Sequence, residues 1–104
     1  MDKNVFAVLE EMIANRKTAE TNISYTAQLL QGNIDKLLKK IGEEATEVVI
    51  ASKGAEKSEV IYESCDLIYH LMVLWAREGI TLNDISIELS RRFGQSGLEE
   101  KANR

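Results

Sequence analysis

The chain contains no proline among its 104 residues. Average usage would supply about five, because proline makes up about five per cent of ordinary proteins. Proline is excluded from helix interiors since it lacks a backbone N–H and clashes with the preceding turn. With only six glycines as well, the chain is free to be mostly helical. Its length predicts a single domain over residues 1–104.

Charge and cysteine content narrow the class of protein further. Thirteen basic and 17 acidic residues leave a formal charge of −4, which argues against non-specific binding of nucleic acid through its phosphates. One cysteine, Cys65, excludes an internal disulfide framework and a cysteine-rich zinc site. The first thirty residues are too charged for a signal peptide, and the longest apolar run, 67–76, is too short for a membrane span. We therefore expect a soluble, cytoplasmic protein with no nucleic-acid or membrane partner.

Apolar residues recur at helical spacing along most of the chain. They predict helices over 4–20, 33–53, 57–78 and from 81 to about 93, with a short helix near 25–31. The connections are short, so neighbouring helices should run antiparallel. We predict an all-α bundle of four to five helices. Because so short a chain buries a modest fraction of its surface, we expect homodimerisation to complete the core.

Glycines and a capping pair mark the predicted helix ends. Gly54 and Gly79 are typical helix stops, and Thr81 with Asp84 is typical of a capped helix start. In the helix that follows, Ile85 and Leu89 should face the core. The tail over 94–104 has two glycines and many charges, so we expect it to be loose unless something docks it.

Each of the two longest predicted helices contains a pair of acidic residues. Glu44 and Glu47 lie three residues apart, as do Glu63 and Asp66, and residues at this spacing share a helix face. With residue 55 as the centre of the turn, Glu47 and Glu63 are each eight residues away, and Glu44 and Asp66 are each eleven away. An antiparallel hairpin therefore places the four acids on two level rungs, one helical turn or about 5 Å apart.

These rungs fall at the border of the apolar stripes, where two helices can face each other around a groove. At about 100° per residue, Glu44 lies roughly 70° from the centre of its stripe. Acids on helices usually form a solvated face, but clustered carboxylates repel one another unless a cation or protons intervene. Asp66 also lies within 61–75, the most apolar stretch of the chain. Four oxygen ligands suit a hard divalent cation, Mg²⁺ or Mn²⁺.

Several short strings around these acids occur in a recognisable order. Glu43-Glu44-Ala45-Thr46-Glu47, fifteen intervening residues, and Glu63-Ser64-Cys65-Asp66 look like the EExxE…ExxD signature of the all-α NTP pyrophosphohydrolases, the MazG-like superfamily. The flanking strings are Ser24-Tyr25-Thr26, Gly32, residues 39–44, residues 66–71, residues 88–92 and residues 94–101. Together they resemble the phosphoribosyl-ATP pyrophosphohydrolase family of histidine biosynthesis over nearly the whole chain. Members of the family are often fused to a cyclohydrolase domain. The 104 residues of this chain are too few to include one, so the stand-alone form is expected.

The resemblance implies hydrolysis of 1-(5-phospho-β-D-ribosyl)-ATP to the corresponding AMP derivative and pyrophosphate, by attack of water on the α-phosphorus. It also implies Mg²⁺ dependence and a homodimeric helical bundle. By position, the metal ligands would be Glu44, Glu47, Glu63 and Asp66, in agreement with the rungs. Glu43 points about 100° away from Glu44 and would polarise water, bind a second cation or cap a salt bridge.

Other polar residues near the acids are candidates for substrate binding. Lys40 is the first candidate for a phosphate ligand because it lies one turn from Glu44. Weaker candidates are Lys36, Lys39, Lys53, Arg91 and Arg92. His70 would hydrogen-bond Asp66 or a substrate phosphate, or be structural. Tyr25 and Tyr69 would stack on the base or pack in the core, and Met72, Trp75 and Cys65 would pack or form dimer contacts.

Two alternatives to this enzyme stay open from the sequence. One is a house-cleaning (d)NTP pyrophosphohydrolase of the same superfamily. The other is a non-catalytic helical dimerisation module whose acids are only solvated. A di-iron bundle is a weaker alternative, since such sites use Glu-x-x-His pairs and this chain has a single histidine.

Overall fold

A computed structural model describes residues 4–94 and 97–102, and all regular secondary structure in these residues is helical. The helices are α1 (Val5–Ala14), α2 (Tyr25–Gln31), α3 (Ile34–Gly54), α4 (Lys57–Glu78), α5 (Leu82–Arg91) and α6 (Gly97–Ala102). The all-α prediction is therefore confirmed. Within the described part of the chain, no helix combines the length and the apolar character that crossing a membrane requires.

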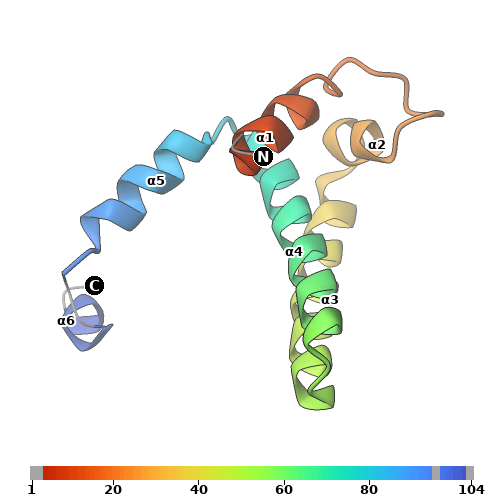
Figure 1. Ribbon diagram of the computed structural model, residues 1–104. Coiled ribbons are helices and arrows are strands. Elements are labelled where there is room, and N and C mark those ends of the chain that lie inside the picture. Colours follow the sequence, from red (N-terminus) through yellow and green to blue (C-terminus); the bar gives the residue numbers. More distant parts are fainter. Residues whose placement is uncertain (1–3, 95–96, 103–104) are drawn as a thin grey trace.

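The two longest helices, α3 and α4, lie side by side as an antiparallel hairpin (Figure 1). Asn33 begins α3 by accepting a hydrogen bond from the backbone N–H of Asp35. Gly54 was expected to be the stop after α3, but it is the last helical residue, and Ala55 takes the left-handed conformation with a φ of 63°. The turn thus places an unfavourable backbone angle on a residue that has a Cβ atom.

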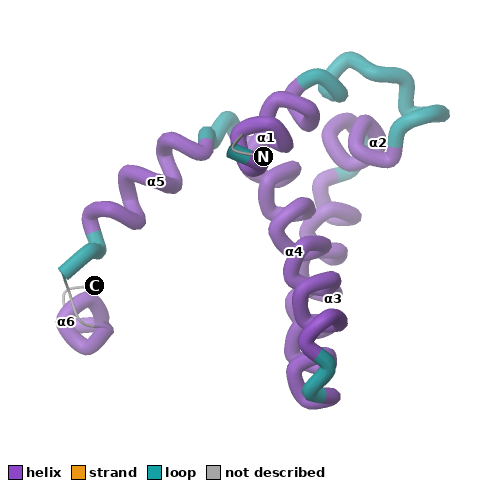
Figure 2. The backbone as a smooth tube through the Cα atoms, in the orientation of Figure 1, coloured by secondary structure: helices purple, strands orange, loops and turns teal. Residues whose placement is uncertain are grey.

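The core lies at the end of the hairpin remote from this turn, where α1 and α2 pack against α4 (Figure 2). Its buried apolar side chains come from four helices and are Ile13, Leu29, Leu37, Met72 and Val73. Burial of these side chains fixes the α3–α4 hairpin relative to α2. The region toward the turn has no third helix against it among the described residues, so its side chains are held by the hairpin alone.

Side chains of α4 hold α2 at both of its ends. Tyr25 and Thr26 at the start of α2 hydrogen-bond His70 and Tyr69, respectively. At the other end, Nη1 of Arg77 donates to the carbonyl oxygens of Leu29 and Gly32, at 2.8 and 2.7 Å. These contacts place the first turn of α2 next to the middle of α4.

Helix α1 is shorter than predicted, since it ends at Ala14 and not near residue 20. The chain continues through turns stabilised by bonds such as that from Arg16 N–H to the Ile13 carbonyl. The apolar repeat stops at Ile13, and the residues directly after it have no large apolar side chain whose burial would stabilise a longer helix. Of the predicted stripe on α1, Ile13 alone is buried, while Val5 and Met12 are 71% and 52% exposed.

Helix α5 leads away from the hairpin as an arm (Figure 1). It begins at the predicted capping pair, with reciprocal hydrogen bonds between Thr81 and Asp84. The prediction that Leu89 faces the core is wrong for this chain, because Leu89 is 52% exposed and α5 packs mainly against α1. Helix α6 lies within the predicted loose tail, where the sequence predicted no helix; residues 95–96 and 103–104 of that tail lie outside the described residues.

Candidate metal centre

Three carboxylates from the two hairpin helices converge on one point. Oxygen atoms of Glu44, Glu63 and Asp66 all lie within 4.8 Å of one another. Glu44 is on α3 and the other two are on α4, one helical turn apart. The level pairing of the hairpin, deduced from distances to the turn, is what brings them together. Glu44 is buried, and the other two are partly buried.

The charges in this cluster repel one another, and one lysine offsets them in part. The pKa of Glu63 is raised, first by burial and then by the negative charges of Glu47 and Glu44. Lys40 places its Nζ atom 3.2 Å from Oε2 of Glu44, and this hydrogen bond is the main reason why the pKa of Lys40 is raised. The nearly buried Glu44 therefore has a cationic partner, which lowers the cost of keeping its charge out of water.

The two other acids of the motif lie outside this tight group. Glu47 is exposed, one turn along α3 from Glu44, and it acts on Glu63 through its charge. Glu43 is also exposed and lies 3.9 Å from the Lys40 ammonium, so it takes part in a salt bridge, one of its three predicted roles. Lys39 lines a surface concavity together with Glu43 and Glu47.

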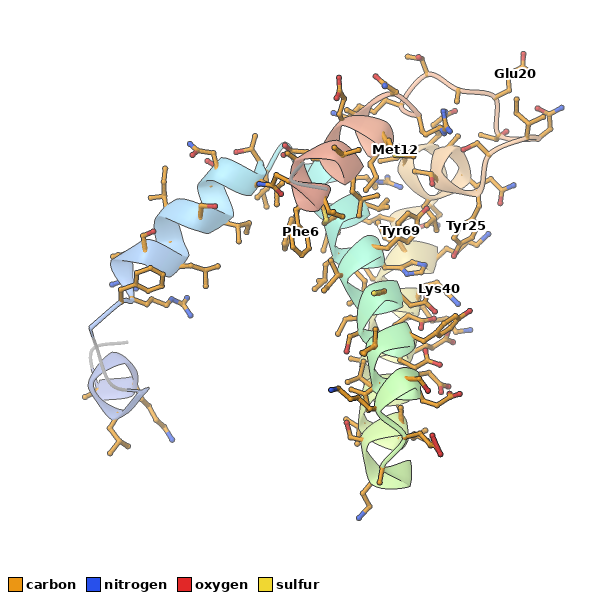
Figure 3. All side chains as sticks on the ribbon, in the orientation of Figure 1. Phe6, Met12, Glu20, Tyr25, Lys40 and Tyr69 are labelled. Carbon is orange, nitrogen blue, oxygen red and sulfur yellow. The ribbon has the colours of Figure 1, made fainter. Side chains whose placement is uncertain are left out.

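His70 is buried beside the cluster and has partners on both ring nitrogens. Its Nδ1 atom donates to the backbone carbonyl of Asp66 at 2.8 Å, and a bond to Asp66 is one of the roles predicted for His70. Its Nε2 atom lies 3.1 Å from the hydroxyl oxygen of Tyr25. Lys36 approaches the Tyr25 ring, with its Nζ atom 5.9 Å from the ring centre. Tyr25 and Lys40 thus extend the site away from the hairpin turn (Figure 3).

Two predicted phosphate ligands are not brought to the acids in this chain. Arg91 and Arg92 lie at the end of the α5 arm, where both bind the carboxylate of Glu88. These hydrogen bonds lower the pKa of Glu88 to about 2. The contacts by which Arg77 and Thr26 hold α2 to α4 were not predicted from the sequence. Their contacts span more than 40 positions, and no local pattern signals a pairing at that distance.

One hollow in the described surface lies at the other end of α4 from the acids. It has a volume of about 410 Å³ and is lined mainly by apolar atoms, with Met72, Trp75 and Gly79 on one side and Ala14 on the other. Nothing in this lining resembles a set of metal ligands. The chemistry expected from the sequence therefore belongs to the acid cluster on the hairpin.

The donor set of the cluster suits a hard divalent cation. All three ligands are carboxylates, which Mg²⁺ and Mn²⁺ prefer over nitrogen or sulfur donors. The partial burial and mutual repulsion of the carboxylates would be relieved by a bound cation. Comparison with known proteins then decides the family: residues 6–93 match the family described as phosphoribosyl-ATP pyrophosphohydrolase.

This chain belongs to the phosphoribosyl-ATP pyrophosphohydrolase family. It is 50% identical to "Phosphoribosyl-ATP pyrophosphatase" of Geobacter metallireducens over 97% of this chain and 93% of the relative. It is 51% identical to the protein of the same name from Methylococcus capsulatus, over 92% and 91%. A third relative is "Histidine biosynthesis bifunctional protein HisIE" of Caldanaerobacter subterraneus, which is 59% identical over 82% of this chain and 42% of that longer protein. The resemblance seen in the sequence is confirmed.

Proposed function

We propose that this chain hydrolyses 1-(5-phospho-β-D-ribosyl)-ATP to 1-(5-phospho-β-D-ribosyl)-AMP and pyrophosphate, the second step of histidine biosynthesis. The observation that carries the proposal is the convergence of Glu44, Glu63 and Asp66 within 4.8 Å. It is supported by relatives that are named for this activity and align over nearly their whole length. As an enzyme acting on a small nucleotide, the chain would work in the cytoplasm.

The three clustered carboxylates would hold Mg²⁺, with Mn²⁺ as a substitute. Such an ion neutralises charge on phosphate oxygens and lowers the pKa of water. We include Glu47 as a fourth ligand because it is exposed, its charge reaches Glu63, and its side chain is free to turn toward the group. Glu43 remains a catalytic candidate whose described partner is Lys40.

The chain's own residues would position the substrate, which is the main demand of phosphoryl transfer. Water attacks the α-phosphorus, the bond from that phosphorus to the bridging oxygen breaks, and pyrophosphate leaves. Lys40, which is partly exposed and already oriented by Glu44, would bind the phosphate oxygens. Lys36 and Lys39 lie on the same helix and would extend this positive charge along the substrate.

We further propose that the enzyme is a homodimer. Apolar side chains on three helices are exposed in the single chain, among them Val5 and Met12 on α1, Ile61 on α4 and Leu89 on α5. Patches of this kind mark interaction sites. Arg91 and Arg92 stay candidates for phosphate binding, but because α5 leads away from the hairpin, they would reach the acids of a partner and not those of their own chain.

The decisive experiment measures pyrophosphate released from phosphoribosyl-ATP with and without Mg²⁺. Asp66→Asn and Glu63→Gln keep the size of the side chain and remove the charge. Each should lower turnover by more than the roughly 10- to 100-fold that loss of an outer-shell metal partner costs. The matched control is Glu59→Gln, which removes an exposed acid one turn before Glu63 on the same helix and should change turnover little.

Two results would contradict the proposal. Full activity of both cluster variants would exclude the carboxylates as metal ligands. Faster hydrolysis of deoxynucleoside triphosphates than of phosphoribosyl-ATP by the unaltered protein would favour the house-cleaning alternative. Circular dichroism on each variant establishes that the helices are intact.

A further inference from the structure

Tyr25 lies beside the acid cluster without being one of its ligands. It is the first residue of α2, is 44% exposed, and lies on the same side of the hairpin as Lys40 (Figure 3). Burial of the hydroxyl raises the pKa of Tyr25, the positive charge of Lys40 opposes the rise, and the charges of Glu44 and Asp66 add to it. The hydroxyl is therefore within electrostatic reach of two of the three clustered carboxylates.

His70 determines the direction of the hydrogen bond at Tyr25. The Nδ1 atom of His70 lies 2.8 Å from the carbonyl oxygen of Asp66, and a carbonyl only accepts, so Nδ1 carries a hydrogen. In the neutral ring, Nε2 is then an acceptor, and it lies 3.1 Å from the Tyr25 hydroxyl oxygen. With the ring in this neutral form, Tyr25 donates its single hydroxyl hydrogen to His70. Its oxygen keeps its lone pairs and offers a bound molecule an acceptor only.

The surroundings hold this arrangement in place. His70 is only 5% exposed, and its ring makes edge contacts with Tyr25 and Tyr69, at centre distances of 6.0 and 5.0 Å. The ammonium of Lys36 lies over the Tyr25 ring, so at most one ring face is left for the base stacking that the sequence suggested. The hydroxyl oxygen, more than the ring, is the part of Tyr25 suited to recognising a ligand.

A hydrogen-bond acceptor at this position favours those groups of a nucleotide that can donate a hydrogen bond. Phosphate oxygens are acceptors themselves and would not pair with it. If the proposed function holds, the α-phosphorus lies at the acid cluster, and the nearest donors by covalent connection are the hydroxyls of the ribose esterified to that phosphate. We propose that Tyr25, held by His70, accepts a hydrogen bond from a hydroxyl of this ribose and so makes the site favour ribonucleotides over deoxyribonucleotides.

Equilibrium binding tests this proposal without relying on turnover. Isothermal titration with AMP, 2′-deoxy-AMP and 3′-deoxy-AMP, each with Mg²⁺, compares the unaltered protein with Tyr25→Phe. The unaltered protein should bind AMP roughly three- to tenfold more tightly than one of the deoxynucleotides, as expected for one hydrogen bond. Tyr25→Phe should bind all three equally. Equal affinities in the unaltered protein, or no binding of AMP at millimolar concentration, would overturn the proposal.

Two further variants separate recognition from a structural role. Tyr69→Phe removes the neighbouring hydrogen bond between α4 and Thr26 and leaves Tyr25 in place, so it should keep the preference for AMP. If Tyr69→Phe loses the preference for AMP as fully as Tyr25→Phe does, the two tyrosine hydroxyls serve only to hold α2 against α4, and the proposal is wrong. His70→Leu frees the Tyr25 hydrogen and should abolish the preference for AMP. The double variant of His70→Leu with Tyr25→Phe should show the same ratio of affinities for AMP and its deoxy forms as either single variant.

The outcome can be told apart from that of the proposed function. Hydrolysis of phosphoribosyl-ATP without any preference for AMP over its deoxy forms would reject the role of Tyr25 alone. A preference for AMP that depends on Tyr25, without hydrolysis, would reject the activity alone. A lower kcat in Tyr25→Phe with an unchanged binding preference would mean that the hydroxyl faces the attacking water, and the assignment to ribose would then be wrong.

Discussion

The α3–α4 hairpin and the α5 arm were both predicted as helices from the same kind of apolar periodicity, yet their surroundings differ. On the hairpin, Leu37 and Val73 are fully buried. On the arm, Leu89 is 52% exposed and Ile87 is 61% exposed. The periodicity therefore predicts a helix and its apolar side, but it does not predict whether the same chain supplies the surface that covers that side. The predictions that test this contrast run from the largest expected effect to the smallest.

The largest difference should appear on removing a leucine from each region. Leu37→Ala should lower the free energy of unfolding by about 3–5 kcal/mol, because it leaves a cavity in a packed core. Leu89→Ala, the matched change on the arm, should cost less than about 1 kcal/mol in a dilute sample of separate chains. Urea unfolding followed by circular dichroism measures both.

The same pair of variants also tests self-association. If the arm of one chain packs on another, the cost of Leu89→Ala should grow with protein concentration, since dimerisation contributes to stability by mass action. A cost that is equal at low and high concentration would show that α5 packs on no second copy.

Mg²⁺ should stabilise the hairpin and leave the arm unchanged. At a concentration of about 100 times its Kd, a ligand that binds only the folded state adds about 2.7 kcal/mol. Hydrogen exchange should slow around Glu44 and Asp66 but not in α5. Asp66→Asn should remove most of the effect, and an equal shift in that variant would mean that the ion binds elsewhere.

Removing the Arg77 side chain from the hairpin helix α4 should lower the free energy of unfolding by an intermediate amount. Arg77→Ala removes two hydrogen bonds to α2 carbonyls, at a cost of about 1–3 kcal/mol. Arg92→Ala on the arm breaks an exposed pair with Glu88 and should cost between about 0 and 1 kcal/mol. Thermal unfolding compares the two, and equal costs would contradict the contrast between the regions.

A substitution in the hairpin turn should be stabilising. Ala55 has a φ of 63°, and a left-handed angle costs a residue with a Cβ atom about 1–2 kcal/mol. Ala55→Gly relieves this strain but gives the unfolded chain more freedom, which offsets about 0.4–1 kcal/mol of the gain. The net rise in unfolding free energy should be between about 0 and 1.6 kcal/mol. Ala51→Gly, within α3 itself, should instead destabilise.

The smallest effect concerns pH and the arm. Arg91 and Arg92 lower the pKa of Glu88 from 4.5 to about 2. A lowered carboxyl pKa means that the stabilisation is complete above pH 4.5 and is lost as pH falls toward 2. The carboxyl carbon of Glu88 should therefore titrate near pH 2 by NMR, and near 4.5 in the double variant Arg91→Ala with Arg92→Ala. Titration near 4.5 in the unaltered protein would show that the arginines do not pair with it.

The candidate site could be predicted in large part because its geometry is local. Glu63 and Asp66 share a face through helical spacing, and the short turn after α3 sets Asp66 level with Glu44 and Glu63 level with Glu47. Three of these four acids converge in the structure. The bond from His70 to the Asp66 carbonyl is equally local, because the two residues are four apart on one helix. The sequence did not predict that Glu47 lies outside the tight group, because side-chain direction around the edge of a helix depends on packing.

Other features depended on contacts between distant parts of the chain. Tyr25 and His70 are 45 residues apart, and the helix that brings them together, α2, has only seven residues. An isolated helix so short is marginal in water, so its position comes from packing and from the bonds to Tyr69 and Arg77. Helix α1 ends at Ala14, directly after Ile13, its buried side chain.

The sequence by itself thus determined the presence of helices α1 to α5, the all-α class and the pairing of acids across the hairpin, since each follows from spacing along one or two helices. The tertiary structure alone decided which acids converge, which side of each helix is buried, and that Tyr25 pairs with His70. The physical reason is that helix periodicity is a property of neighbouring residues. Burial and hydrogen-bond direction depend on which distant residues the folded chain places against each helix.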